Sequence, residues 1–222
     1  MATQFNDWFR TRTTLFLYWA VFALVLLAAA LFALRGDLAS AFGTLLILLL
    51  MLGPTILKQR YRLHIPFALD LGIVVFIFLT LFLGGIAEFY DRIPFWDKFL
   101  HFQSGLLLGA AGYLLVYILN EHEKIHLNLS PGFVSFFAIT FSLAIGAVWE
   151  IFEFAGDQLF AITFWQGVGV ADTMWDLIAD GAGALIVSVS GYFWMYRHKR
   201  LPFTPWLFRF FSERLKGVRD ER

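Results

Sequence analysis

"TLFLYWAVFALVLLAAALFAL", residues 14–34, is the stretch that decides the class of fold. It contains no charged side chain, and at about 1.5 Å of rise per residue a helix of this length crosses a hydrocarbon core of ~30 Å. The run is longer than the ~7–15 apolar residues of a secretory signal. We therefore interpret it as a transmembrane helix that the protein retains.

The composition extends this interpretation to the rest of the chain. Of its 222 residues, 59% are hydrophobic and 15% are charged, and the mean hydropathy is +0.71. Soluble domains average about 45–50% apolar and about 25% charged residues. Apolar runs near the length of a membrane span lie at 14–34, 38–57, 65–87, 97–119, 132–157 and 172–196. The sequence thus predicts an all-α integral membrane protein, a six-transmembrane-helix bundle that forms one domain over residues 1–200.

Basic side chains predict the orientation of this bundle, because Lys and Arg in short loops favour the cytoplasmic side. Of the 17 Lys and Arg residues, 14 fall before the first span, after the last span or in alternate loops. The other three, Arg35, Arg92 and Lys98, fall near the opposite ends of the spans. We expect both termini to be cytoplasmic and the loops 88–97 and 158–171 to lie outside.

The C-terminal segment 201–222 differs from the spans. In TPWLFRFFSERLKG, residues 204–217, apolar side chains recur at helical spacing and charged ones occupy the other face. This pattern is typical of a helix that lies at a membrane surface. We expect a short interfacial helix in an amphipathic cytoplasmic tail, and a tail that packs on the loops is the alternative.

Two features that the sequence lacks limit the ligands and partners that the protein could have. The chain has no cysteine, so a metal site would use oxygen and imidazole ligands. Its formal net charge is zero and it has no basic repeat interleaved with aromatic residues, so nucleic acid is not an expected partner. The partner that the composition predicts is the lipid bilayer.

Ionisable side chains gather on one face of each of the last three spans, because residues three or four apart share a helix face. They are Asp97 and His101 in the fourth span, Glu150 and Glu153 in the fifth, and Asp176 and Asp180 in the sixth. The predicted topology brings all of them to the outer third of the bilayer. Asp157 and Asp172 are rim positions on the same faces, and the sequence leaves open whether they belong to the group.

Such a cluster is costly in a membrane. An ionised Asp near a helix centre costs about 2.5 to 3.5 kcal/mol, and Asp176 and Asp180 together cost on the order of 5 kcal/mol. Because crowded carboxylates cannot all stay ionised, we expect compensation. A bound cation, shared protons, or basic neighbours such as Arg92 and Lys98 would each supply it.

Three motifs resemble those of the YjdF-like family of bacterial inner-membrane proteins. They are YDRIPFWDKFLHFQSGLLLG at 90–109, WEIFEF at 149–154 and WDLIADGAGALI at 175–186. The resemblance implies a multi-pass protein of the bacterial inner (cytoplasmic) membrane whose functional residues are the six side chains of the last three spans. The chain is more distantly similar to VanZ-like proteins, but it has Glu153 and Asp180 where that pattern has Gln and Asn.

The cluster is compatible with three functions. The first is a metal-dependent enzyme that acts on a lipid or lipid-linked substrate from the outer leaflet, since carboxylates with an imidazole suit Mg²⁺, Mn²⁺, Zn²⁺ or Fe²⁺. The candidate metal ligands are Asp97, His101, Glu150, Glu153, Asp176 and Asp180, and the candidate catalytic residues are His101, Glu150, Glu153 and Asp176. A proton- or cation-coupled transporter and a structural polar network are the alternatives.

Two smaller predictions concern single segments. The aromatic-rich stretch LFAITFWQGVGVA, residues 159–171, is too short to span the bilayer and suits an interfacial lid over the cluster. Asp70, near the inner end of the third span, is expected to pair with the basic cluster at 58–64 rather than to take part in chemistry.

Overall fold

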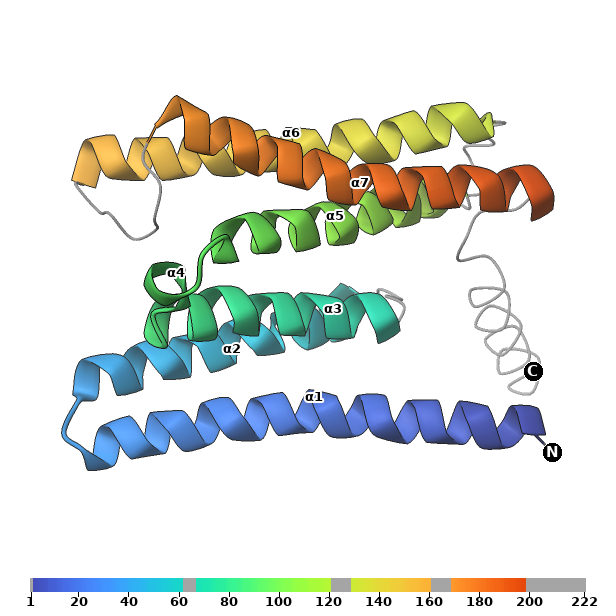
Figure 1. Ribbon diagram of the computed structural model, residues 1–222. Coiled ribbons are helices and arrows are strands. Elements are labelled where there is room, and N and C mark those ends of the chain that lie inside the picture. The colour runs from blue at the N-terminus through green and yellow to red at the C-terminus, as the bar shows by residue number, and fades with distance from the viewer. Residues whose placement is uncertain (1, 62–66, 121–128, 161–168, 199–222) are drawn as a thin grey trace. The chain divides into compact units, whose positions relative to one another are not determined.

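A computed structural model describes residues 2–61, 67–120, 129–160 and 169–198, and within these ranges every regular element is a helix (Figure 1). The elements are α1 (Ala2–Leu34), α2 (Leu38–Tyr61), α3 (Phe67–Ile77), the π-helix η1 (Phe78–Ile86), α4 (Phe89–Arg92), α5 (Trp96–Asn120), α6 (Pro131–Phe160) and α7 (Val170–His198). The tail at 201–222 and most of the expected lid lie outside the described residues. The all-α prediction is confirmed.

Six helical stretches in the described residues are long and apolar enough to cross a membrane. They are Leu15–Leu34, Leu38–Arg60, Leu69–Ile86, Trp96–Val116, Pro131–Gly156 and Val170–His198. Each lies within a few residues of a span predicted from the sequence. Many of their large apolar side chains, such as Phe16 and Leu27, are exposed in the isolated chain. Such exposure suits a protein whose outer surface is covered by lipid.

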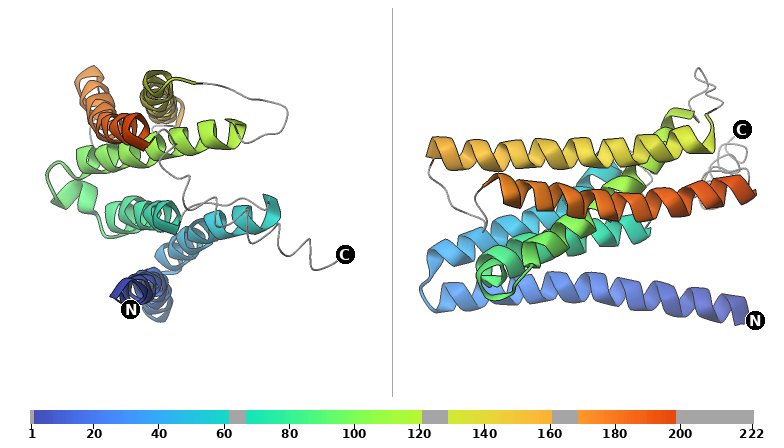
Figure 2. Two further views of the ribbon diagram at one scale, coloured as in Figure 1. Left: turned by 90° about the vertical axis from the view of Figure 1, so that its right-hand side faces the viewer. Right: turned by 45° about the horizontal axis from the view of Figure 1, so that its top comes forward.

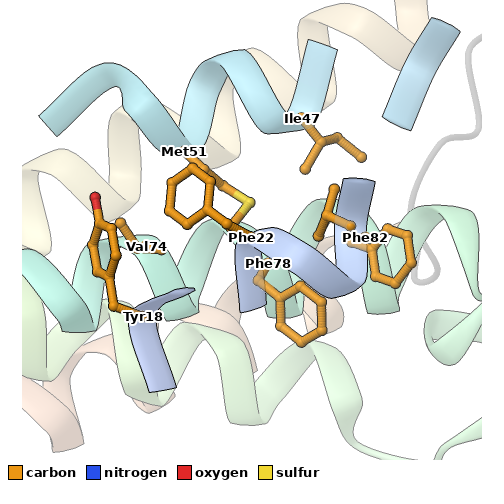
Figure 3. Close-up of a cluster of buried hydrophobic side chains, with 8 residues drawn as sticks. Tyr18, Phe22, Ile47, Met51, Val74, Phe78 and Phe82 are labelled. Atoms are coloured by element: carbon orange, nitrogen blue, oxygen red, sulfur yellow. The ribbon is translucent and has the colours of Figure 1, made fainter. Parts of the chain in front are cut away.

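The helices form two compact units, and the boundary falls within α5, between Leu100 and His101. In the first unit, α1, α2, α3 and η1 bury a core around Phe22, Met51 and Val74, which Figure 3 shows together with the stacked rings of Phe78 and Phe82. This core is mostly apolar and holds the first three spans together by packing, and the Tyr18 hydroxyl in it lies 3.1 Å from the Thr55 hydroxyl.

The third span changes from α-helix to π-helix at Phe78. The hydropathy pattern does not predict this change, because hydropathy indicates which residues are apolar and not which backbone carbonyl accepts each hydrogen bond. The backbone N–H of Ala87 donates to the carbonyl of Phe82 at 2.9 Å, a bond across five residues. Gly84 leaves room for the ring of Tyr90, because a Cβ at this position would overlap that ring. The buried Tyr90 thereby holds α4 against η1.

The second unit consists of α5 from His101 onward with α6 and α7, and α6 and α7 lie side by side in both views of Figure 2. Small residues let the backbones approach closely. A Cβ at Gly183 would strike the backbone of α5, and one at Gly112 would lie 2.9 Å from the Cα of Ala138 on α6. Three helices packed this closely hold the polar side chains between them in fixed positions.

A buried group of hydrogen bonds connects α5, α6 and α7 nearer the C-terminal end of α5. The Tyr113 hydroxyl on α5 donates to the carbonyl of Ser188 on α7 at 2.9 Å and lies 2.5 Å from the Ser135 hydroxyl on α6. Since the tyrosine proton goes to Ser188, Ser135 is the donor in the second contact. Gly191 makes this possible, because a Cβ there would overlap the tyrosine ring.

Candidate metal centre

His101 is the centre of the polar cluster in the second unit. Its side chain lies near the start of α5 and is buried, and both ring nitrogens face carboxylates from the other two helices. Nδ1 lies 3.1 Å from Asp180 Oδ2. Nε2 lies 3.5 Å from Glu150 Oε1 and 3.9 Å from Asp176 Oδ1. One imidazole therefore contacts acidic groups from α6 and α7 at once.

Helix direction and spacing explain why these residues meet. His101 is near the start of α5, whereas Glu150 and Glu153 lie in the second half of α6, which runs the opposite way. Asp176 and Asp180 are one turn apart near the start of α7, which turns back again. Because residues three or four apart share a face, each helix presents its ionisable group to the same point. The second unit thus brings together five predicted site residues, His101, Glu150, Glu153, Asp176 and Asp180.

A metal ion suits the donor set on the Nε2 side of His101. One ligand atom from each of His101, Glu150 and Glu153 lies within 4.8 Å of the others, so the three lie within reach of a single cation. The donors are imidazole nitrogen and carboxylate oxygen, with no thiolate in the chain. Manganese, iron and zinc accept both donor types, and magnesium prefers oxygen alone.

Burial makes the charge of this cluster expensive. Glu150 is 7% exposed, Asp176 2% and Asp180 0%. A buried carboxylate stays ionised only if a positive charge or hydrogen bonds compensate it. A protonated His101 supplies a single positive charge for the carboxylates that face its ring. A bound cation, or protons shared among the acids, would lower this cost further.

Asp180 has surroundings that differ from those of the other acids. The Ser104 hydroxyl, on α5, is hydrogen-bonded to Asp180 Oδ1 and also lies 2.8 Å from the carbonyl of His101. A Cβ at Gly146 would overlap the Asp180 carboxylate, and one at Gly105 would overlap its backbone carbonyl. Asp180 is thus fitted closely between α5 and α6.

Ser104 is not among the residues predicted from the sequence. A lone serine in an apolar helix is a weak signal, and its position three residues after His101 was the only hint. Gly146, by contrast, lies four residues before Glu150 on the acidic face of α6, and its missing side chain leaves the space that Asp180 fills. Both residues act on the cluster through Asp180.

The remaining acidic residues belong to the first unit or lie near the ends of α6 and α7. Asp97 belongs to the first unit, begins α5 one turn before His101, and pairs with Lys98 at 3.1 Å. Asp172 is partly buried in the first turn of α7, and Asp157 lies in α6 but its side chain is outside the described part. Asp70 pairs with Lys58 at 2.5 Å within the first unit, which confirms the pairing expected with the basic cluster at 58–64.

Three large aromatic side chains that neighbour the cluster residues in sequence are exposed. Phe152 and Phe154 on α6 are 68% and 66% exposed, and Trp175 on α7 is 62% exposed. They alternate along the chain with the site residues Glu153 and Asp176.

Comparison with known proteins supports the assignment of this chain as a membrane protein. Residues 15–197 match a family described as "Predicted membrane protein (DUF2238)". An uncharacterised protein of Thermotoga maritima is 30% identical over 149 residues, which cover 67% of this chain and 74% of that protein. No solved structure matches the chain. The resemblances to YjdF-like and VanZ-like proteins stay predictions.

Proposed function

The chain belongs to the DUF2238 family of predicted membrane proteins, and we propose that in it His101, Glu150, Glu153 and Asp176 bind a divalent metal ion. We propose further that the ion serves an enzymatic reaction on a lipid or lipid-linked substrate, in the inner membrane of a bacterium. The observation that carries the proposal is the charge of the buried cluster. One imidazole faces the carboxylates of Glu150, Asp176 and Asp180, and a cation beside its Nε2 atom would compensate them.

Manganese, iron or zinc is the expected ion. A nitrogen ligand from His101 with two or three carboxylates suits these metals better than magnesium, which prefers an all-oxygen shell. Such an ion would supply Lewis acidity, polarising a phosphoryl or carbonyl oxygen of the substrate. The protein residues would hold the ion, exclude bulk water through their burial, and orient the substrate's polar group.

The aromatic surroundings support a lipid-like substrate. The exposed rings of Phe152, Phe154 and Trp175 would contact acyl or isoprenoid chains, while Glu153 lies beside them and is only partly buried. The predicted orientation puts this end of α5, α6 and α7 at the outer leaflet. An amphiphile could then reach the site sideways from the membrane.

Packing further along the helices favours an enzyme over a transporter. One to two turns beyond His101, Gly105 lies against the backbone of Asp180, and a Cβ at Gly109 would lie 3.3 Å from Val187 Cβ on α7. Backbones in such contact leave no space for a chain of water molecules between α5 and α7. This contact supports chemistry at one membrane face over passage between α5 and α7.

Metal content of the purified protein tests the proposal. We expect about one Mn²⁺, Fe²⁺ or Zn²⁺ per chain in protein that is purified without chelator, and a Glu150→Gln, Asp176→Asn double variant to bind at least ~100-fold more weakly. The matched control is the Asp37→Asn, Glu88→Gln double variant, which removes the same two charges from exposed positions and should bind as the wild type does. Absence of stoichiometric metal in the wild type at neutral pH, or equal affinity in both double variants, would contradict the proposal.

Lipid analysis tests the enzymatic part. Cells that overproduce the wild type should lose one lipid class or gain a product that cells with the Glu150→Gln, Asp176→Asn variant do not. The comparison is made by mass spectrometry of total lipid extracts from cells with equal amounts of each protein. Identical lipid profiles would remove the support for a lipid substrate and leave the metal site to be judged by its own test.

A further inference from the structure

We infer that Asp180 is a positioning residue and not a metal ligand: it holds the Nδ1–H edge of His101 so that Nε2 faces Glu150 and Asp176. The function of this contact, to orient His101 for metal binding, rests on the proposed metal site. The hydrogen bond itself can be tested in protein from which metal has been removed. This separates Asp180 from the other five residues that the sequence analysis grouped as candidate ligands.

The two edges of the His101 ring have different surroundings. At 3.1 Å the contact from Nδ1 to Asp180 is a hydrogen bond. On the opposite edge, Nε2 is 3.5 Å from Glu150 Oε1 and 3.9 Å from Asp176 Oδ1, distances at which the nitrogen and an oxygen can bind the same ion. Because the lone pair of each nitrogen points outward from its own edge, an ion bound by Nε2 lies away from the Asp180 carboxylate.

Both oxygens of Asp180 are already engaged within the second unit. Oδ2 faces His101 Nδ1, and Oδ1 is hydrogen-bonded to the Ser104 hydroxyl. The carboxylate is fully buried, and Gly146 and Gly105 provide the space that it occupies. Metal-binding histidines commonly donate their second N–H to such a carboxylate, which selects the ring orientation and raises the basicity of the ligating nitrogen.

Ser104 determines which hydrogen bonds the side chain at position 180 has to make. A serine hydroxyl has one proton, so Ser104 donates either to the His101 carbonyl, 2.8 Å away, or to Asp180 Oδ1. When asparagine replaces Asp180, the Ser104 hydroxyl can donate to the His101 carbonyl and accept from the new side chain, whose oxygen accepts from His101 Nδ1–H. An asparagine can thus make both contacts, with its NH₂ and its carbonyl oxygen, whereas a ligand carboxylate cannot be replaced in this way. Substitution by asparagine therefore distinguishes the two roles.

Nitrogen NMR of the metal-free protein tests the inference directly. The protein is labelled with ¹⁵N-histidine, and the His101 signals are assigned by their loss in His101→Gln. We expect Nδ1 to carry a proton in the wild type and in Asp180→Asn. In Asp180→Leu we expect Nδ1 to lose its proton, because Glu150 and Asp176 then accept from Nε2–H instead. An unprotonated Nδ1 in the wild type would overturn the inference, and this result does not depend on whether any variant folds. An unchanged Nδ1–H in a folded Asp180→Leu protein would also overturn it.

Metal titration separates this inference from the proposed function. With Mn²⁺ as the probe, we expect Asp180→Asn to bind within about threefold of the wild type, Asp180→Leu about 10–100-fold more weakly, and Glu150→Gln more weakly still. If Asp180→Asn lost as much affinity as Glu150→Gln, Asp180 would be a ligand and the inference would be wrong. If the wild type bound no metal while Nδ1 kept its proton, the proposed function would fail and the positioning contact would stand.

Discussion

At the scale of single residues, His101 is the point on which the site depends. Its imidazole lies between Asp180 on one edge and Glu150 with Asp176 on the other. The different distances on the two edges divide the acidic residues into a positioning group and candidate ligands. Ser104 belongs with the first group, because its hydroxyl contacts Asp180 and the backbone of His101.

Replacing Ser104 by alanine should lower the free energy of unfolding by about 1 to 3 kcal/mol, because it removes a hydrogen bond from a buried acid. The measurement is thermal or denaturant unfolding in the same detergent. Ser190→Ala, at an exposed position on α7, is the matched control and should change stability by less than about 0.5 kcal/mol. Equal stability of the two variants would show that the Ser104 contact contributes nothing.

The sequence predicted which acidic and imidazole residues share helix faces, because that follows from the helical period alone. It did not separate Asp180 from Asp176, although they are one turn apart on α7. Their difference depends on which edge of the His101 ring each meets, and this is set by the packing of α5 against α7. Spacing along one helix contains no information about rotation relative to another.

At the scale of helices, glycines decide how the second unit packs. Gly105 lies where a Cβ would overlap the backbone carbonyl of Asp180, whereas Gly156 on α6 has nothing within 4 Å of that position. Small residues in a membrane helix commonly lie at helix contacts, and the sequence does not say which of them do. Only the structure shows which of them lie against backbone and which face open space.

Gly105→Ala and Gly156→Ala should therefore act in opposite directions. The first forces α5 and α7 apart and should cost about 1 to 3 kcal/mol of unfolding free energy. The second gains helix propensity and should stabilise by up to about 1 kcal/mol. Unfolding of both variants under identical conditions checks this, and a destabilisation of similar size in both would contradict the packing described.

Asp37 shows a pH-dependent contact at the start of α2. It accepts from the Ser40 backbone N–H at 3.1 Å, and hydrogen bonds from the Ser40 side chain and backbone hold the pKa of this carboxyl below its usual value. The ionised form is thus favoured in the folded state. Its contribution to stability is present above the usual carboxyl pKa and is lost as pH falls through the lowered value.

The thermal unfolding temperature of Asp37→Ala should therefore lie below that of the wild type at pH 7, and the difference should shrink below about pH 4. Asp37→Asn, which does not titrate, should keep a constant offset from Asp37→Ala across the same range. A wild-type advantage over Asp37→Ala that stayed constant down to pH 3 would contradict the capping role.

At the scale of the whole molecule, length and hydropathy predicted the membrane spans to within a few residues. These quantities describe transfer into lipid, which depends on composition and little on detailed packing. The π-helix at Phe78–Ile86 escaped prediction because its residues are as apolar as those of an α-helix. The orientation in the membrane follows from loop charge and stays a prediction.

Cysteine labelling tests that orientation, since the natural chain has no cysteine. A membrane-impermeant thiol reagent should label Glu88→Cys in intact cells, and should label Lys124→Cys only after the membrane is opened. Both variants carry one substitution in a predicted loop, so each is the control for the other. The reverse pattern would put the acidic cluster at the cytoplasmic face and the substrate in the inner leaflet.

The central claim is that His101 binds a divalent metal through Nε2 together with carboxylates from α6 and α7. Pulsed electron paramagnetic resonance of Mn²⁺-loaded, ¹⁵N-histidine-labelled protein measures this directly, because a bound nitrogen nucleus gives a resolved hyperfine coupling. We predict coupling to a single histidine nitrogen in the wild type and its disappearance in His101→Gln. Bound Mn²⁺ without nitrogen coupling, or with coupling that His101→Gln leaves unchanged, would contradict the claim.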